Sequence, residues 1–153
     1  MKTAHNAEIT VFANEGEDLE KIKRKIKNLA AIDLTKEKAI LEHTTATGAL
    51  NNRIDILKIR LEKERQVNQF LQELMSKLTK EQKNMLLEQT ESRVDEECNF
   101  FIRLDKEKLL DGEYWITDSG NCFHIKILIA AYPAKKEKAE GIIKKILNKS
   151  SLN

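Results

Sequence analysis

The sequence predicts an α+β domain with a mixed, largely antiparallel sheet and helices packed on one of its faces. Segments with period-2 alternation, such as residues 8–13 and 123–129, are mixed with segments of helical periodicity. The predicted order of elements, β-α-β-β-α-α-β-β-β-α, lacks the strict alternation that is typical of a parallel sheet. No Gly/Ser-rich linker or internal repeat divides the chain. We therefore expect one domain over residues 1–153, with loose termini at residues 1–6 and 149–153.

The first half of the chain is predicted to form three strands and one helix. Residues 8–13 alternate between two faces, as a strand does. A helix follows, in which four apolar residues have helical spacing: Leu19, Ile22, Ile26 and Leu29. A second strand is expected at residues 38–42, before a polar, Thr-rich loop at residues 43–48. A third strand is expected at residues 53–61.

The third predicted strand changes the phase of its apolar residues. Ile54 and Ile56 share one phase, and the other phase then contains the apolar side chains of Leu57, Ile59 and Leu61. A β-bulge inserts one extra residue and produces such a slip, so we predict a bulge here. Arg53 and Asp55 then share one face before the slip, while Lys58 and Arg60 alternate with the second apolar set after it.

The second half of the chain is predicted to form three helices and three strands, with an additional helical turn between the first two strands. Thr79 and Gln82 have the spacing of a capping box, which indicates that a new helix begins after Thr79. In order, we expect helices over residues 62–78 and from residue 80, a strand over 100–105, a helical turn over 106–110, strands over 114–116 and 123–129, and a helix over 134–148.

Composition indicates a globular protein with a heavily charged surface. Hydrophobic residues make up 41% and charged residues 34% of the 153 positions, which excludes a wholly disordered chain. The net charge of +2 is only mildly basic, so affinity for nucleic acid must depend on where the charges lie. Cys98 and Cys122 form no Cys-x-x-Cys motif, and neither a secretory signal nor an apolar run of membrane-spanning length occurs. We therefore expect a cytoplasmic protein with no membrane contact.

Basic and aromatic side chains recur at alternate positions on three predicted strands. They are Lys58 and Arg60, Phe101 and Arg103, and His124 and Lys126. If the helices cover the other face of the sheet, these side chains share one open surface. Cationic groups on such a surface can contact phosphates, and an aromatic ring can stack on a base. An ordinary solvated face carries the same kinds of residues, so the pattern alone leaves RNA binding and simple solvation open.

A purely structural role is a rival interpretation for part of this set. Arg93, Asp95, Arg103 and Asp105 alternate in charge and are close in the sequence. Opposite charges this close can bond one another and brace the turn before the strand.

No constellation of residues indicates catalysis. The chain has three histidines, and none lies in a nucleophile, zinc-protease, P-loop or dinucleotide-binding motif. We therefore expect neither an enzyme nor a bound cofactor or metal ion. His43 is interpreted as a strand-end histidine bonded to a carbonyl, with a substrate contact as the alternative.

One string in the sequence resembles the signature of a known family. The string is Arg93-Val-Asp95…Phe101-Ile-Arg103-Leu-Asp105-Lys106…Gly112. It resembles the signature of an archaeal family of predicted RNA-binding proteins, whose members are described as exosome subunits or exosome-associated proteins. The resemblance extends over nearly the whole chain, through the loop at residues 48–54 and the segment at residues 127–132.

The resemblance carries expectations for fold, partners and site residues. It implies a curved sheet similar to that of the ribosomal protein that binds 5S rRNA, and RNA and exosome subunits as partners. It also adds Lys106 to the residues expected to contact RNA. Asn51 stands where the family usually has glycine, and Asn is the next best residue for a positive φ. Arg53 stands where the family commonly has proline.

These observations together predict a non-catalytic RNA-binding protein that is accessory to RNA processing or degradation. The residues expected to contact RNA are Arg53, Lys58, Arg60, Phe101, Arg103, Lys106 and Lys126. The alternative is a protein–protein adaptor or homodimer that uses the same sheet face. Leu128 and Ala130 support this alternative, because they place apolar side chains on the nominally polar face of the last strand.

Overall fold

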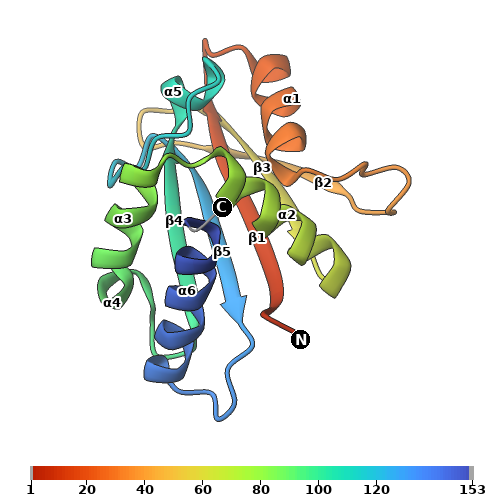
Figure 1. The fold of residues 1–153 in the computed structure, drawn as a ribbon. Helices are drawn as coiled ribbons and strands as arrows, with labels where there is room; N and C mark the ends of the chain where they lie inside the picture. The colour runs from red at the N-terminus through yellow and green to blue at the C-terminus, as the bar shows by residue number, and fades with distance from the viewer. Residues whose placement is uncertain (1, 152–153) are drawn as a thin grey trace.

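Five antiparallel strands form one sheet in the order β2-β3-β1-β5-β4 (Figure 1). This structure is a computed structural model and describes residues 2–151. The strands are β1 (Ala4–Asn14), β2 (Leu41–Thr47), β3 (Arg53–Leu61), β4 (Asn99–Asp105) and β5 (Cys122–Ile129). The predicted α+β class with a largely antiparallel sheet is confirmed, and every pair of neighbouring strands in the sheet is antiparallel.

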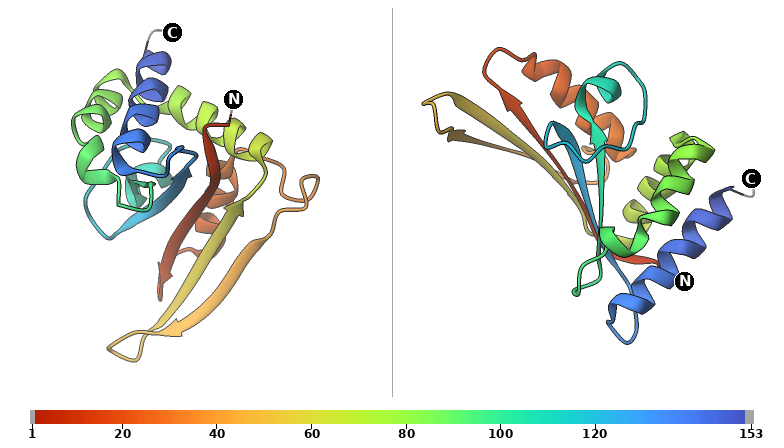
Figure 2. Two further views of the ribbon diagram at one scale, coloured as in Figure 1. Left: turned by 90° about the horizontal axis from the view of Figure 1, so that it is seen from below. Right: turned by 90° about the vertical axis from the view of Figure 1, so that its left-hand side faces the viewer.

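All the helices of the described residues lie on one side of this sheet (Figure 2). They are α1 (Leu19–Ala30), α2 (Glu64–Lys77), α3 (Lys80–Glu88), α4 (Thr90–Arg93), α5 (Lys106–Leu110) and α6 (Lys136–Ser151). Helices α1 and α2 pack on β1, while α6 packs on β5 and α4 on β4. The sheet therefore has a helix-covered face and an open face. Among residues 2–151, no helix has both the length and the apolar character needed to cross a membrane.

The hydrophobic core lies between the helices and the covered face of the sheet. Alternate residues of each central strand point into it, and these side chains are at most 1% exposed: Ile9, Val11, Leu57, Ile59, Leu61, Phe123, Ile125 and Ile127. The apolar stripe of α2 meets them with Val67, Phe70 and Leu74. The buried side chains form a single cluster, as expected when one layer of helices packs on one sheet.

Two helix starts follow from capping residues that the sequence contains. The Asp18 carboxylate accepts a hydrogen bond from the Lys21 amide at 3.1 Å and caps α1. Thr79 caps α3 in the same way through the amide of Gln82 at 3.2 Å, so the predicted start of this helix is confirmed. The side chain of Gln82 does not complete a capping box. Its oxygen accepts from the Ile116 amide at 2.6 Å and ties the segment beside β4 to α3.

The second strand begins three residues later and ends five residues later than the sequence indicated. Residues 41–47 form β2, so most of the predicted Thr-rich loop is a strand, and residues 38–40 precede it. The small polar side chains suggested a loop, but threonine is β-branched and suits a strand that pairs along β3. The turn between β2 and β3 contains Asn51 at φ 61°, which confirms the positive φ expected at this position.

The predicted β-bulge in β3 is wrong. Pairing with β1 runs without interruption from Ala7 opposite Leu61 to Asn14 opposite Ile54. The apparent phase slip arises because both faces of β3 carry apolar residues at this end. Ile54 and Ile56 lie on the open face near Phe12, whose side chain is 51% exposed.

One further expectation differs from the structure. The segment at residues 114–116 forms a single bridge, between Ile116 and Leu104, because Gln82 rather than a strand partner takes the Ile116 amide. Trp115 in this segment is 46% exposed, with the Lys108 ammonium 5.3 Å from the centre of its ring. Strand β1 begins at Ala4 and α6 extends to Ser151, residues 1 and 152–153 lie outside the described part of the chain, and the loose termini at residues 1–6 and 149–153 stay a prediction.

Candidate nucleic-acid interface

The open face of the sheet gathers the basic and aromatic side chains that the sequence placed on three separate strands. Strand pairing aligns them in two neighbouring rows. One row runs Arg60, Glu8, Lys126, Phe101 across β3, β1, β5 and β4. The next row runs Lys58, Thr10, His124, Arg103 across the same strands. Their common facing follows from regular alternation along unbulged strands, which holds for all four strands over this region.

Exposure is not uniform over these two rows. Arg60 and Arg103 are exposed, whereas Lys58, Phe101, His124 and Lys126 are half-buried. Half-buried lysine stems are normal on a sheet, because the chain lies along its neighbours while the ammonium reaches water. The rows therefore present cationic groups and two partly exposed aromatic rings at the surface.

One acidic side chain lies in the middle of this basic surface. The Glu8 carboxylate is 3.0 Å from the Lys58 ammonium and faces Arg60 and Lys126 on the neighbouring strands. Burial raises the pKa of Glu8, but its hydrogen bond to Lys58 and the positive charges around it outweigh burial and lower the pKa overall. Glu8 is therefore ionised at neutral pH and offsets part of the positive charge. Sequence pattern drew attention to cations and rings, so Glu8 was missed, although its alternation with Ile9 placed it on this face.

Phe101 and His124 form an aromatic pair at the β4 end of the rows. Their ring centroids are 5.7 Å apart with an angle of 42° between the ring planes. Burial is the largest cause that lowers the pKa of His124, and the charge of Arg103 lowers it further. The ordinary value is 6.5, so the imidazole is neutral at pH 7 and offers an uncharged ring face.

A pocket of about 570 Å³ opens beside this aromatic pair, between β4 and the end of α4. Its walls include Phe101, His124, Arg103 and Arg93. Arg93 is 8% exposed and comes from α4, not from the sheet. The sequence contained Arg93 in the signature string, but nothing in the local pattern indicated that it would meet Arg103 and the turn at Asp118.

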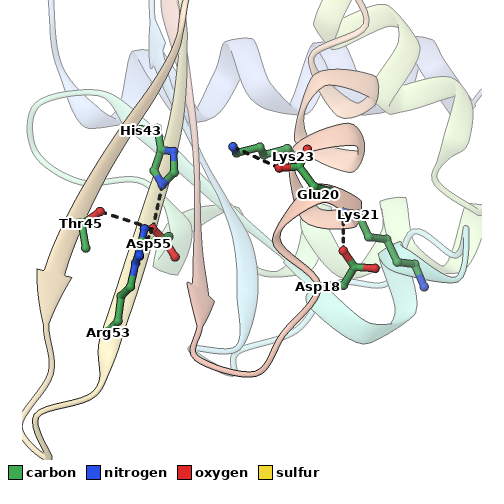
Figure 3. A network of polar contacts seen from close by, with 8 residues as sticks. All are labelled: Asp18, Glu20, Lys21, Lys23, His43, Thr45, Arg53 and Asp55. Carbon is green, nitrogen blue, oxygen red and sulfur yellow. Dashed lines mark hydrogen bonds and ion pairs between the residues drawn. The ribbon is translucent and has the colours of Figure 1, made fainter.

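Arg53 lies on the opposite face from the two rows. It shares the phase of Asp55 on β3, and its guanidinium donates to the Asp55 carboxylate at 3.1 Å. His43 and Thr45 of β2 point to the same carboxylate, at 2.8 Å and 3.4 Å (Figure 3). His43 therefore bonds a carboxylate, not the carbonyl that was expected. Arg53 belongs to a polar network within the β2–β3 hairpin.

Lys106 is buried and fully engaged within the protein. Its side chain is 3% exposed, and its ammonium donates to the Phe12 carbonyl at 2.6 Å and to the Glu17 carboxylate at 3.0 Å. It comes from the first turn of α5, which packs against α1, β4 and β5. The expectation that Lys106 contacts RNA does not fit this position, because a phosphate could reach the ammonium only by displacing these partners.

The four alternating charges near β4 do not bond one another, so the predicted bracing by mutual ion pairs is wrong. Arg93 donates to Gln89 and Asp118, and Arg103 donates to the Asp118 carbonyl at 3.1 Å. The Asp95 carboxylate accepts from the Glu97 and Asn99 amides and holds the turn before β4. Asp105 caps α5. Each charge therefore has a structural partner outside this set of four, and the two arginines share Asp118.

No group of three or more His, Cys, Asp or Glu side chains that could hold a metal ion occurs within residues 2–151. Cys98 and Cys122 form no disulfide bond, and both are buried. Burial raises the pKa of each thiol.

Comparisons with known proteins identify a family model and several relatives that agree with one another. A sequence model of a family described as RNA binding matches residues 6–131. An RNA-binding protein from Pyrococcus abyssi is 31% identical over 134 residues, which cover 88% of this chain and 87% of that protein. A solved DUF54 protein from Methanothermobacter thermautotrophicus is 31% identical with a TM-score of 0.78, over 95% of this chain and 98% of that one. Another, from Sulfolobus solfataricus, is 26% identical with a TM-score of 0.73, over 94% and 98%.

The matched range bears directly on the surface described above. Residues 6–131 contain both rows of the open face and the pocket at β4. Similarity to the ribosomal protein that binds 5S rRNA stays a prediction. The extent of the family match and the likeness to the archaeal relatives lead to one conclusion: this chain belongs to the RNA-binding family whose model it matches.

Proposed function

We propose that this protein binds single-stranded RNA on the open face of its sheet and catalyses no reaction on it. The observation that carries the proposal is the register of the strands. It aligns Arg60 with Lys126 and Phe101 in one row, and Lys58 with His124 and Arg103 in the next. Membership of the RNA-binding family supports the same ligand.

The chemistry of the face favours a single strand over a duplex. The bases of a duplex are stacked and paired, so their faces cannot meet a protein ring, whereas unpaired bases stack readily on aromatic side chains. Phe101 and His124 lie at one end of the rows, and the cations lie along them. A strand that crosses the sheet would place its phosphates near Lys126 and Arg60 and a base near the two rings.

The test is a titration of a labelled single-stranded oligonucleotide at several salt concentrations. Each phosphate contact on a single strand contributes about 0.7 to the slope of log K against log salt. The double variant Arg60→Ala/Lys126→Ala should therefore reduce that slope by about 1.4 and weaken binding.

A control variant separates the face from the overall charge of the protein. Arg24→Ala/Lys144→Ala removes the same charges from exposed positions on α1 and α6, on the helix side of the molecule. It should change the slope much less. Equal effects of the two double variants would show that binding depends on net charge and not on the open face.

The absence of catalysis needs its own measurement. Incubation of the protein with single-stranded and structured RNA in the presence of Mg²⁺ should leave the RNA intact. RNA cleavage that survives further purification of the protein would contradict the non-catalytic part of the proposal.

An accessory role in RNA processing or degradation, with exosome subunits as partners, is the finer part of the proposal. It is supported by the resemblance of the signature string around β4 to exosome-associated archaeal proteins. Co-sedimentation with a reconstituted archaeal exosome should retain this protein, and retention should persist after ribonuclease treatment. Loss of the complex on ribonuclease treatment would show that RNA, not a protein surface, bridges the two.

The adaptor or homodimer remains a second candidate because of the β2 edge. Strand β2 lies at the border of the sheet, and six of its seven residues, Glu42 to Thr47, are exposed. The neighbouring open-face residues Ile54, Ile56 and Phe12 are apolar, which suits strand addition by a partner. Size-exclusion chromatography with light scattering distinguishes the states, and a monomer at all concentrations would dismiss the homodimer.

A further inference from the structure

The pocket at the β4 edge has a chemistry that differs from the rest of the open face. Its volume of about 570 Å³ lies within the ~300–1,000 Å³ typical of small-molecule sites. Elsewhere, the open face is formed by sheet residues alone. The pocket adds Arg93 and Gln89 from α4 and the end of α3, and Asp118 from the turn before β5. Two segments outside the sheet, residues 89–93 and the turn at Asp118, thus enclose the side chains of β4 and β5.

Two guanidinium groups share this pocket with a single carboxylate. The Arg93 guanidinium is held by the Gln89 amide oxygen at 2.8 and 2.6 Å and lies 3.3 Å from the Asp118 carboxylate. Arg103 donates to the main-chain oxygen of Asp118, not to its carboxylate. The Asp118 side chain is 89% exposed, so solvent screens its charge. The charged groups that line the pocket therefore leave an excess of positive charge.

The pKa of Arg93 agrees with an excess of positive charge in the pocket. Burial is the main cause that lowers the pKa of Arg93, and the charge of Arg103 lowers it further against the opposing effect of Asp118. The two guanidinium groups thus repel each other across a partly enclosed space. An anion placed between them would relieve the repulsion and accept hydrogen bonds from both planar groups.

The opposite wall of the pocket is aromatic. The rings of Phe101 and His124 are tilted by 42° at a separation of 5.7 Å, and both line the pocket. A ring of a ligand can stack against such a wall, since every nucleobase has a π face. A cationic wall and an aromatic wall in one pocket match the two ends of a nucleotide, its phosphate and its base.

We propose that this pocket holds one unpaired nucleotide, with its phosphate on Arg93 and Arg103 and its base against Phe101 and His124. The proposal rests on the proposed function, because it gives the RNA strand on the open face a defined end at β4. It goes further in naming the ligand class, a phosphate-bearing nucleotide, and in assigning a role to Arg93. The phosphate is either terminal or an internal phosphodiester, since both offer anionic oxygens to the same groups.

The experiment is an NMR titration of the protein with adenosine 5′-monophosphate, followed through the amides of β4 and β5. Saturable shifts are expected at the amides of Phe101, Arg103 and His124. Adenosine without phosphate should bind about tenfold or more weakly, because it lacks the group that meets the arginines. Absence of saturable shifts at these amides would overturn the proposal.

The half-buried Phe101 and the exposed Arg103 supply the variants, because replacing the buried Arg93 risks unfolding. Phe101→Ala and Arg103→Gln should each weaken the nucleotide by about tenfold, as expected for loss of one stacking or charged contact. Arg60→Gln is the matched control, since Arg60 lies on β3 and outside the pocket. It should weaken an oligonucleotide but leave the mononucleotide unchanged. Equal weakening of the mononucleotide by Arg60→Gln and Arg103→Gln would show general charge attraction and contradict the pocket.

Two oligonucleotides identify the source of the phosphate. A hexanucleotide with hydroxyl ends that shifts the pocket amides supports an internal phosphodiester, and one that requires a 5′-phosphate to do so supports a terminal group. If Arg60→Ala/Lys126→Ala weakens the hexanucleotide while no nucleotide reaches the pocket, the open-face function stands and the pocket proposal fails. If the mononucleotide shifts the pocket but that double variant binds RNA normally, the pocket stands and the open-face proposal fails.

Discussion

On β1, Ile9 is fully buried under the helices, while its neighbour Glu8 lies among lysine and arginine side chains on the open face. The same contrast recurs on β4, where Ile102 is fully buried and Arg103 is exposed. One face excludes water and is filled by aliphatic and aromatic groups. The other keeps water and carries charge. The side chains that stabilise the core and those that we propose to contact RNA are one residue apart along each strand, so each set can be changed with limited effect on the other.

The largest difference between the two faces should appear in a pair of phenylalanine variants. Phe123 is fully buried on the covered face, whereas Phe101 is half-buried on the open face. Phe123→Ala should lower the free energy of unfolding by about 3–5 kcal/mol through lost burial and a cavity. Phe101→Ala should lower it by about 1 kcal/mol or less. Equilibrium urea denaturation measures both, and similar losses would show that the open face is part of the core.

Lys106 and Lys108 test whether burial rather than charge decides the role of a lysine near the interface. Lys106→Met removes hydrogen bonds to the Phe12 carbonyl and the Glu17 carboxylate, and should destabilise the fold by about 1–3 kcal/mol. Lys108→Met, at a half-exposed side chain 3.7 Å from Glu113, should cost about 0–1 kcal/mol. Neither should change RNA affinity once folding is complete. Weaker RNA binding by a stably folded Lys106→Met protein would support the phosphate contact that was expected for Lys106.

Removal of the Glu8 charge should strengthen RNA binding by the open face. Glu8→Gln removes the only carboxylate named in the two rows and should tighten RNA binding, with the salt slope steeper by up to about 0.7. Stability should change by about 1 kcal/mol or less, because the pair with Lys58 is partly exposed. Glu20→Gln on α1, which pairs with Lys23, is the charge-matched control and should leave RNA affinity nearly unchanged. Filter binding at several salt concentrations gives both values; weaker binding by Glu8→Gln would mean that its carboxylate positions the cations.

The smallest expected effect concerns the hairpin network and the dependence of stability on pH. In this network, the hydrogen bond between His43 and the Asp55 carboxylate is the main cause that lowers the pKa of Asp55 below its ordinary value of 3.8. Burial acts in the opposite direction. Because the pKa is lower in the folded state, the ionised carboxylate stabilises the fold above about pH 3.8, and this contribution is lost as the pH falls further. Between about pH 5 and pH 3, the unfolding free energy of the wild type should therefore fall more steeply than that of Asp55→Asn. Parallel curves in urea denaturation would show that the network does not couple to folding.

Much of the fold and part of the site followed from local pattern. Alternation along β4 and β5 correctly separated Phe101 and Arg103 from Ile102, and His124 and Lys126 from Ile125. The start of α3 followed from Thr79, because a cap involves residues within one turn. Pattern failed at residues 43–47, where small and mostly polar side chains favoured a loop although these residues pair along β3 as a strand. It failed again at Ile54 and Ile56, where apolar residues lie on the open side.

The sequence by itself determined which residues share a face within each strand, because side-chain direction alternates with every residue and needs no knowledge of the neighbours. Only the tertiary structure decided what those residues meet. It placed Glu8 between Arg60 and Lys126, buried Lys106 against Phe12 and Glu17, and brought Arg93 to Asp118. These contacts join positions far apart in the chain, since Lys106 lies 94 residues from Phe12 and Arg93 lies 25 from Asp118. Strand order and helix docking create them, and local periodicity contains no information about either.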